Sequence, residues 1–579
     1  MPCRLQQKRA HCNRTMMEVF ENMEFMEMTL GKLLERNARV YAGRLAVKYM
    51  DRDYCRTWKE LDEEVDRLAR GFMAMGVTKG DHVAIWATNV PQWLLTWFAT
   101  SKIGAVLVTV NTNYKQFELQ YLLGQSDSKV LVMTGGFKDV DYVKTIHKLI
   151  PALPLSEPGN LSVEEFPFLK TIVYVGENCP AGMIPWDDLE KKGETVPREE
   201  FRRLSDSLHH HEIINMQYTS GTTGFPKGVM LTHYNIINNG LSIGDCMKFT
   251  EDDKLCIPVP LFHCFGMVLA VMASVTHGTG MVPLEYYNPV KLMKAVQDEE
   301  CTAVHGVPTM FIAVLEHPEF DKYRFPRLRT GIMAGSPCPA KVMQLVIDKM
   351  GMKDITIVFG QTESSPGCTQ SLADDSIELK VNTVGRELPG VECKIVDTDT
   401  GVEVGPNVQG EFCARGYNIM RGYYKMEEAT RQAIDEDGWL HTGDLATKDE
   451  NGYYRITGRI KDMIIRGGEN IYPKEVEELL YTQPKVKDVQ VIGVPSDAYG
   501  EEVMACIVLR KNVESCTPKE IQDFVRENMA RHKVPSYVAF MKEFPMTASG
   551  KIQKYKMREW AIKELGLKSP KKKEKTMTA

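Results

Sequence analysis

The sequence has no long apolar run of the kind that forms a membrane-spanning helix. Candidates such as Gly266 to Val275 are too short to cross a bilayer, which excludes a spanning topology. It also has no excess of positive charge, because 71 Lys and Arg residues stand against 77 Asp and Glu residues, a net charge of −6. This balance does not favour a nucleic acid as a partner. The length of 579 residues and the hydrophobic fraction of 43% predict a soluble globular protein of two or more domains.

The sequence also lacks paired cysteines. Its 14 cysteines are scattered from Cys3 to Cys516 without a Cys-x-x-Cys pair, which predicts reduced, mostly buried thiols in an intracellular protein. None of them is assigned to a metal. The run His209 to His211 carries metal-binding side chains, but three consecutive residues cannot easily face one ion, and no partner has ligand spacing. A zinc site there is not favoured.

Both ends of the chain are basic. Residues 1–17 contain no acid, a composition that fits either a mitochondrial presequence or a disordered, over-extended start, and the second interpretation is preferred. The final stretch, KSPKKKEKTMTA, predicts a frayed tail and does not end in a Ser-Lys-Leu peroxisomal signal. We expect a cytoplasmic location, with the mitochondrial matrix as the alternative.

A loop of small residues, YTSGTTGFPKG, stands between two apolar segments. Ile213 to Tyr218 alternates like a strand, and Val229 to Leu231 resumes the apolar order. Backbone N–H groups, hydroxyls and the ammonium of Lys227 together suit phosphate oxygens. Pro226 precedes Lys227, so the loop is not a Walker A motif, and a P-loop ATPase is disfavoured. A flexible linker is the alternative, but Pro226 and the flanking apolar segments argue for a fixed loop.

The pattern along the first three quarters of the chain is typical of an α/β fold. Thr57 to Glu60 fits a capping box, after which apolar residues recur at helical spacing until Gly76. Apolar runs from His82 and from Gly104 flank a helical segment near Gln92 to Lys102. This order predicts buried parallel strands with crossover helices, and similar runs recur in KTIVYV, TAVHGVP, RTGIMAG and DITIVFG.

The character changes after Arg459. Helices are predicted to begin at Pro473 and after Thr517, and strands are predicted at 489–494 and 503–509. This part is therefore expected to be a compact α+β unit, and it ends in a loop that contains Lys551.

Further stretches carry candidate chemistry. In FGQTES, Gln361 to Glu363 follow an apolar run and would emerge at the carboxyl end of a strand, where ligands bind in open α/β sheets. Glu363 suits Mg²⁺, although a solvated glutamate would be preferred on this stretch alone. Asp444, in GWLHTGDLA, is expected in a tight turn where its carboxylate can accept ribose hydroxyls. Lys551, in TASGKIQK, lies in a loop that can carry an ammonium into a cleft; for a lone lysine the surface interpretation prevails.

Taken in order, YTSGTTGFPKG, FGQTE, TGD, GRIKDMIIRGGENIYP and SGKIQK closely resemble the motif series of the adenylate-forming acyl-CoA synthetases, the AMP-binding enzymes. The resemblance extends from about Leu30 to Leu567 and is greatest for the medium-chain fatty acyl-CoA ligase branch. An ordered series is far more specific than any single motif. It implies an acid–thiol ligase that uses ATP, Mg²⁺ and coenzyme A as co-substrate, joins a fatty acid to AMP with release of pyrophosphate, and then transfers the acyl group to coenzyme A.

The resemblance also implies residue roles. Lys551 would bridge the attacking carboxylate and the α-phosphate, where negative charge accumulates. Glu363 would bind the magnesium ion, and Asp444, assisted by Arg459, would bind the ribose. The residues implied for the phosphates are Thr219, Ser220, Gly221, Thr222, Thr223, Gly224, Phe225, Pro226 and Lys227, with Thr222 counted among the catalytic groups, and those implied for the adenine are Gly335, Ser336, Pro337, Phe359, Gly360, Gln361 and Thr362.

The family's architecture implies a large N-terminal multi-sheet α/β domain and a small mobile C-terminal α+β domain. The expected boundaries are an N-terminal extension at 1–28, the large domain at 29–460, the small domain at 461–568 with a hinge at Lys461, and a basic tail at 569–579. After adenylation the small domain is expected to rotate, withdrawing Lys551 and bringing Gly467, Gly468 and Glu469 toward the coenzyme A channel.

The acyl chain is left open by the sequence. His263, Val307 and Thr309 match positions beside the family's acyl channel, but each fits an ordinary core equally well. One methylene contributes only about 0.8 kcal/mol, so selectivity among neighbouring chain lengths should be weak. Long-chain and aryl acids are the alternatives to a medium-chain substrate. The oligomeric state is also open, with a homodimer as a candidate.

Other functions use the same scaffold. The adenylation module of a peptide synthetase is disfavoured because the chain ends soon after Lys551 without a carrier domain, and nothing in the sequence demands the oxygen chemistry of a luciferase. A non-catalytic nucleotide- or lipid-binding pseudoenzyme is disfavoured because Glu363, Asp444, Arg459 and Lys551 are all present.

Overall fold

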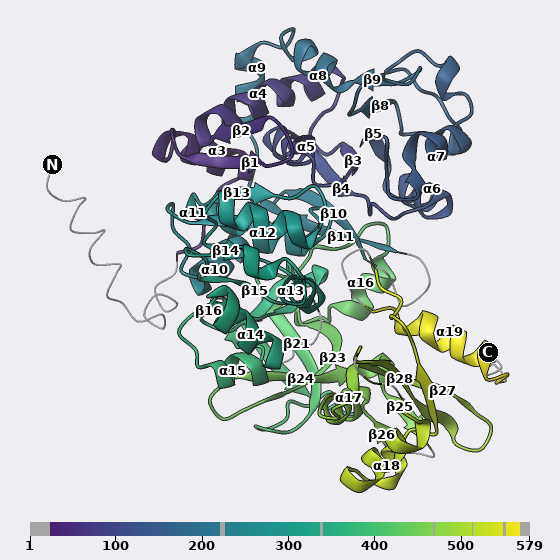
Figure 1. The fold of residues 1–579 in the computed structure, drawn as a ribbon. Coiled ribbons are helices and arrows are strands. Elements are labelled where there is room, and N and C mark those ends of the chain that lie inside the picture. The colour runs from purple at the N-terminus through teal and green to yellow at the C-terminus, as the bar shows by residue number, and fades with distance from the viewer. Residues whose placement is uncertain are drawn as a thin grey trace, which may run out of the picture. The chain divides into compact units, whose positions relative to one another are not determined.

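The computed structural model describes residues 24–219, 226–335, 338, 340–466, 469–511, 513, 515–547 and 552–567. Its chain divides into two compact units (Figure 1). Unit 1 comprises Met1–Cys393 and Ala414–His441, and unit 2 comprises Lys394–Cys413 and Thr442–Ala579. The predicted α/β class is confirmed, because both units combine helices with sheets.

An eight-stranded sheet lies in unit 1. Its central strands β10, β4, β3, β5 and β8 run parallel, as the short apolar runs predict, whereas β11 and β22 continue it antiparallel. The order across the sheet is β22 (Gly422–Tyr423), β11 (Lys227–Thr232), β10 (Ile213–Thr219), β4 (Val106–Thr109), β3 (His82–Trp86), β5 (Ser128–Met133), β8 (Thr171–Tyr174) and β9 (Ile184–Pro185).

The helices before and between these strands follow the predicted signals. Helix α4 (Trp58–Ala74) begins with the expected capping box, in which Thr57 and Glu60 bond to each other's backbone N–H. Helix α5 (Pro91–Lys102) connects β3 to β4 and is buried at nearly every position, so it has no polar face. The other helices of unit 1 are α3 (Leu30–Val40), α6 (Gln116–Gln125), α7 (Tyr142–Leu149), α8 (Trp186–Gly193), α9 (Arg198–Asp206), α10 (His233–Cys246), α11 (Ala273–His277), α12 (Pro289–Asp298), α13 (Pro308–Leu315), α14 (Ala340–Met350), α15 (Ile377–Asn382) and α16 (Glu427–Ala433).

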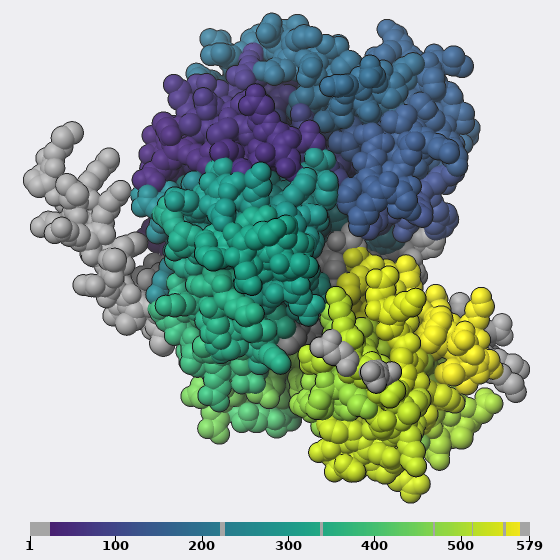
Figure 2. All heavy atoms as spheres, in the orientation of Figure 1, coloured from purple at the N-terminus to yellow at the C-terminus, as the bar shows by residue number. Residues whose placement is uncertain are grey.

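A second sheet of unit 1 has seven strands. It contains the strands predicted from TAVHGVP, RTGIMAG and DITIVFG. Figure 2 shows the surface atoms of this unit, coloured from purple through blue and teal to green. Its order is β16 (Asp354–Thr356), β15 (Thr330–Ile332), β14 (Ala303–Val304), β12 (Lys254–Ile257), β13 (Gly280–Pro283), β1 (Leu45–Tyr49) and β2 (Tyr54–Thr57). Smaller sheets are formed by β17 (Val358–Gly360), β18 (Gly367–Gln370) and β19 (Arg386–Glu387), and by β6 (Gly136–Phe137) with β7 (Val140–Asp141).

The chain passes from one unit to the other within strands of a four-stranded sheet, and the rest of unit 2 is built around a five-stranded sheet. Helices α17 (Pro473–Tyr481) and α18 (Pro518–Asn528) begin where the sequence predicts, the latter capped by Thr517. The four-stranded sheet is β20 (Val391–Val396), β21 (Gly410–Gly416), β23 (Leu440–Lys448) and β24 (Tyr454–Arg459), and the five-stranded sheet is β26 (Glu469–Ile471), β25 (Ile464–Arg466), β28 (Gly500–Leu509), β27 (Val486–Ser496) and β29 (Tyr537–Phe540), with α19 (Lys554–Glu564) following.

Composition led to two further expectations, one about the cysteines and one about membrane-spanning helices. Most cysteines that the structure describes are buried, as the sequence predicts. None of the helices within the described ranges combines the length and the apolar character that a membrane crossing requires.

Candidate functional site

The loop predicted to hold phosphates joins two hydrogen-bonded strands. Thr219 ends β10 and Lys227 begins β11, and these two residues lie directly opposite each other in the antiparallel pair. The strand–loop–strand prediction is therefore confirmed at both ends. Between them, Ser220, Gly221, Thr222, Thr223, Gly224 and Phe225 lie outside the described residues.

Tyr423 contacts both of the charged side chains that the sequence assigns to phosphate and magnesium. Its hydroxyl donates a hydrogen bond of 2.8 Å to Glu363 Oε1. Lys227 Nζ lies 4.7 Å from the centroid of its ring, within cation–π range. Burial and the neighbouring carboxylate raise the pKa of Tyr423, so its phenol stays protonated and can donate. Glu363 and Lys227, far apart in the sequence, are thus held at one place in unit 1.

The backbone fixes Tyr423 at this place. It lies in β22 opposite Val229 of β11, and the next residue, Tyr424, donates its N–H to the carbonyl of Gly228 at 2.8 Å. The N–H of Tyr423 itself donates to Thr430 Oγ1 at 2.9 Å. Tyr423 is not among the residues predicted from the sequence, because RGYY carries no group that signals phosphate or metal chemistry by itself.

In the stretch FGQTES, Gln361 to Glu363 follow the carboxyl end of a strand, as predicted, but that strand belongs to a small antiparallel sheet and not to an open parallel one. The expected strand is divided, because Ile357 exchanges hydrogen bonds with Ser371 after β16 has ended at Thr356. The chain then forms β17, which pairs antiparallel with β18, so Gln361 to Glu363 do not emerge from a parallel strand. A Cβ on Gly360, the last residue of β17, would lie 1.8 Å from the carbonyl oxygen of Pro366, so only glycine fits at this position.

Glu363 then lies in a short 3₁₀ helix. This helix, η5 (Thr362–Ser364), is closed by the Ser364 hydroxyl, which accepts from the Gln361 N–H at 3.1 Å. Thr362 lies beside Cys264, with 3.6 Å between Oγ1 and Sγ. The candidate adenine residues Phe359 to Thr362 therefore adjoin the segment that contains His263.

The candidate acyl residues lie on neighbouring segments of unit 1. His263 precedes a buried π-helix, η3 (Phe265–Met272), and its Nδ1 accepts from the Phe265 N–H at 3.1 Å. The Phe265 ring lies 6.0 Å from that of His305, which stands two residues before Val307. Val307 caps α13, on which Thr309 lies. The segments that contain His263 and Val307 therefore lie side by side, which could not be predicted because they are far apart in the sequence.

Gly335, assigned to the adenine, lies next to Val307, one of the candidate acyl residues. Its φ of +89° lies in the left-handed region, and a Cβ there would meet Val307 Cγ1 at 3.1 Å, so glycine is favoured on both counts. Ser336 and Pro337 lie outside the described residues.

Asp444 and Arg459, assigned to the ribose, form an ion pair in unit 2. They lie opposite each other in β23 and β24, and Arg459 Nε donates to Asp444 Oδ1 at 2.7 Å. The Asp444 side chain is 5% exposed and that of Arg459 is 59% exposed. The prediction of a tight turn is wrong, because Asp444 lies within strand β23. The residue before it, Gly443, takes the left-handed conformation, with φ +70°.

Replacing Asp444 with asparagine is expected to raise the KM for ATP by about tenfold or more, because a buried charged acceptor would be lost from the ribose site. The measurement is the KM for ATP in pyrophosphate release. Glu450→Gln is the matched control, since Glu450 is an exposed acid between β23 and β24. Equal KM values in the two variants would contradict the ribose assignment.

Two of the remaining candidates, Lys461 and Glu469, are described in unit 2. Lys461 lies in a short 3₁₀ helix, η6 (Ile460–Asp462), between β24 and β25, and Glu469 begins β26. Gly467, Gly468 and Lys551 lie outside the described residues. Their roles stay predictions.

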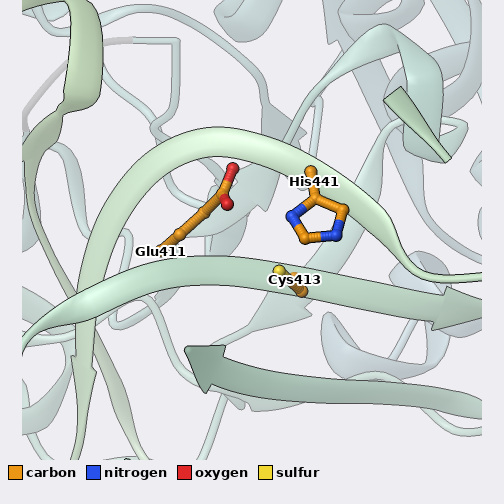
Figure 3. A group of neighbouring side chains, drawn as sticks. All are labelled: Glu411, Cys413 and His441. Carbon is orange, nitrogen blue, oxygen red and sulfur yellow. The ribbon is translucent and has the colours of Figure 1, made fainter. Parts of the chain in front are cut away.

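Three side chains of types that bind metals lie together on the four-stranded sheet. They are Glu411 and Cys413 on β21 and His441 on β23, and their ligand atoms lie within 4.8 Å of one another (Figure 3). Glu411 Oε1 already accepts from the Gly443 N–H at 2.9 Å. His441 Nε2 lies 3.5 Å from a carboxylate oxygen of Asp435. The first contact ties Glu411 to β23 beside Asp444, which is a structural use of this side chain.

Comparison with known families gives the class of the protein. The sequence model of the AMP-binding enzyme family matches residues 34–424, and that of the AMP-binding enzyme C-terminal domain matches residues 475–551. The chain belongs to the AMP-binding enzyme family.

Individual relatives narrow this class. YngI of Bacillus subtilis (strain 168), provisionally named an acyl-CoA synthetase, is 55% identical over 546 residues, which are 94% of this chain and 99% of YngI. The mitochondrial medium-chain acyl-CoA ligase ACSF2 of Macaca fascicularis is 38% identical over 548 residues, 94% of this chain and 88% of ACSF2. This chain is accordingly an enzyme of the acyl-CoA synthetase class, as the motif series predicts.

A solved structure shares the architecture. The anthranilate CoA ligase AuaEII in complex with anthranoyl-AMP superposes with a TM-score of 0.82 at 26% identity, covering 95% of this chain and 100% of that one. The predicted multi-sheet α/β fold is therefore the fold of an adenylate-forming ligase.

Proposed function

We propose that this enzyme activates a medium-chain fatty acid. In the first half-reaction a carboxylate oxygen attacks the α-phosphorus of ATP, and pyrophosphate leaves. In the second the thiol of coenzyme A attacks the acyl carbon, and AMP leaves. The observation that carries the choice of acid is the 38% identity with a medium-chain ligase over 548 residues.

Contacts described within each of the two units support the first half-reaction. A carboxylate is a poor electrophile, so it must be activated before a thiol can attack it. In the activating step the carboxylate is the nucleophile, and its attack on a polyanion requires positioning and charge stabilisation. Lys227 would bind the β- and γ-phosphates together with the loop from Thr219. The ribose would be bound by the ion pair of Asp444 and Arg459, and Lys551 would neutralise charge between the acid and the α-phosphate.

The donor set around Glu363 fits Mg²⁺. Hard cations take oxygen ligands, and Mg²⁺ is usually held by one or two carboxylates together with substrate phosphates. Tyr423 donates to Oε1 of Glu363, and a carboxylate has lone pairs enough to bind a cation as well. When bound, the ion would supply positive charge to the phosphates; Glu363 would hold it.

An aryl acid is the second candidate. The anthranilate CoA ligase with a TM-score of 0.82 favours it, although that protein is only 26% identical to this chain. His263, Val307 and Thr309 would border the acyl group in either case.

The compartment, the partners and the domain movement belong to the same proposal. Fatty acid, ATP and coenzyme A are the expected partners, with a homodimer as the candidate assembly.

The bacterial relative favours the cytoplasm, and the mitochondrial relative supports the matrix as the alternative. Gly467, Gly468 and Glu469 would serve coenzyme A after rotation about Lys461.

The decisive experiment is a substrate panel from acetate to oleate, with benzoate and anthranilate added. We expect kcat/KM for coenzyme A thioester formation to be highest for a medium-chain acid and to change only a few-fold between neighbours, since one methylene is worth about 0.8 kcal/mol. A maximum at an aryl or long-chain acid would overturn the choice of acid. Absence of ATP- and acid-dependent pyrophosphate release with every acid would overturn the activity.

A further inference from the structure

Tyr423 contacts both Glu363 and Lys227 and so joins these two side chains. The first contact uses the phenol hydroxyl and the second uses the ring face, so they can be removed separately. Only 8% of Tyr423 is exposed, and its strand is bonded to the same β11 that Lys227 begins. This rigid support is what a positioning residue requires.

We propose that Tyr423 is a positioning residue for the magnesium nucleotide: its hydroxyl orients the Glu363 carboxylate toward the cation, and its ring holds the Lys227 ammonium beside the phosphates. The proposal rests on the function proposed above. Tyr423 itself would touch neither the acid nor the reacting phosphorus.

The hydroxyl limits the freedom of Glu363. A glutamate has several rotatable bonds, and anchoring Oε1 at 2.8 Å leaves the second oxygen with a narrow range of directions. The backbone carbonyl of Glu363 also accepts from the Met420 N–H at 2.9 Å, three residues before Tyr423. One segment, 420–423, thereby fixes both ends of this residue.

The ring limits the freedom of Lys227. An ammonium 4.7 Å from a tyrosine centroid is attracted to the ring face, and the long lysine side chain loses other positions. No hydroxyl is needed for this contact, so phenylalanine would keep it and leucine would not.

The test compares Tyr423→Phe with Tyr424→Phe. The control removes the hydroxyl of the adjacent residue, which donates to Asp127 Oδ2 at 2.9 Å and not to Glu363. The direct readout is calorimetric binding of ATP with Mg²⁺ and with EDTA. We expect the ratio of the ATP affinity with Mg²⁺ to the ATP affinity with EDTA to be about tenfold or more smaller in Tyr423→Phe than in the parent. This variant should also need correspondingly more Mg²⁺ for half-maximal pyrophosphate release. Tyr424→Phe should keep both values of the parent.

Tyr423→Leu tests the ring. It should weaken ATP binding further in EDTA, by a few-fold relative to Tyr423→Phe; equal affinities would overturn the role for Lys227. A full Mg²⁺-dependent gain in folded Tyr423→Phe, checked by its thermal midpoint, would overturn the role for Glu363, as would the same loss in Tyr424→Phe. If the parent binds magnesium ATP but activates none of the acids, the proposed function fails while the binding test of Tyr423 still stands.

Discussion

The Lys551→Ala enzyme is expected to form acyl-adenylate about 10²–10³-fold more slowly than the parent. The attacking carboxylate and the α-phosphate are both negative, so their approach concentrates charge at one place. A single preorganised group at such a place contributes about 2.7–4 kcal/mol in other enzymes. The measurement is single-turnover pyrophosphate release with ATP and the preferred acid.

Two further measurements isolate this effect. Lys556→Ala removes an exposed cation from α19, five residues along the chain, and should release pyrophosphate at the parent's rate. Thioester formation from synthetic acyl-AMP and coenzyme A should change little in Lys551→Ala, because the α-phosphate bond already exists. Adenylation at the parent's speed in Lys551→Ala would remove the basis of the proposed mechanism.

Local features of the fold follow from the sequence. The capping box at Thr57 and Glu60 satisfies N–H groups within one turn, so neighbouring residues suffice to predict where α4 begins. The start of α17 at Pro473 is similarly local. Motifs with charged groups could likewise be assigned to a reaction by their order.

Features that depend on distant partners could not be predicted. Ile357 leaves the direction of β16 because it bonds to Ser371, and Asp444 lies in a strand because Arg459 is opposite. Tyr423 owes its place to pairing with Val229, nearly two hundred positions earlier in the chain. No local pattern encodes such pairings, since register depends on which strands meet.

The Lys461→Pro enzyme is expected to lose thioester formation far more than adenylate formation. Lys461 lies in η6, between β24 and β25, and the family resemblance implies that the chain turns here between the two half-reactions. Proline fixes φ near −65° and restricts the preceding residue, Ile460, so a second backbone conformation becomes costly. A disfavoured conformation costs on the order of 1–3 kcal/mol, which predicts a selective loss of about 5- to 160-fold.

The half-reactions separate this backbone effect from the loss of a cation. Pyrophosphate release without coenzyme A reports adenylation, and acyl-CoA formation from supplied acyl-AMP reports transfer. Lys461→Ala lacks the ammonium but keeps φ free, so the ratio of proline to alanine rates in each half-reaction measures the backbone alone. A ratio well below one for transfer and close to one for adenylation is the result that a hinge requires, because a fixed φ can suit only one of two orientations. Similar ratios in both half-reactions would mean that Lys461 stabilises a single arrangement, and the proposed rotation would need another pivot.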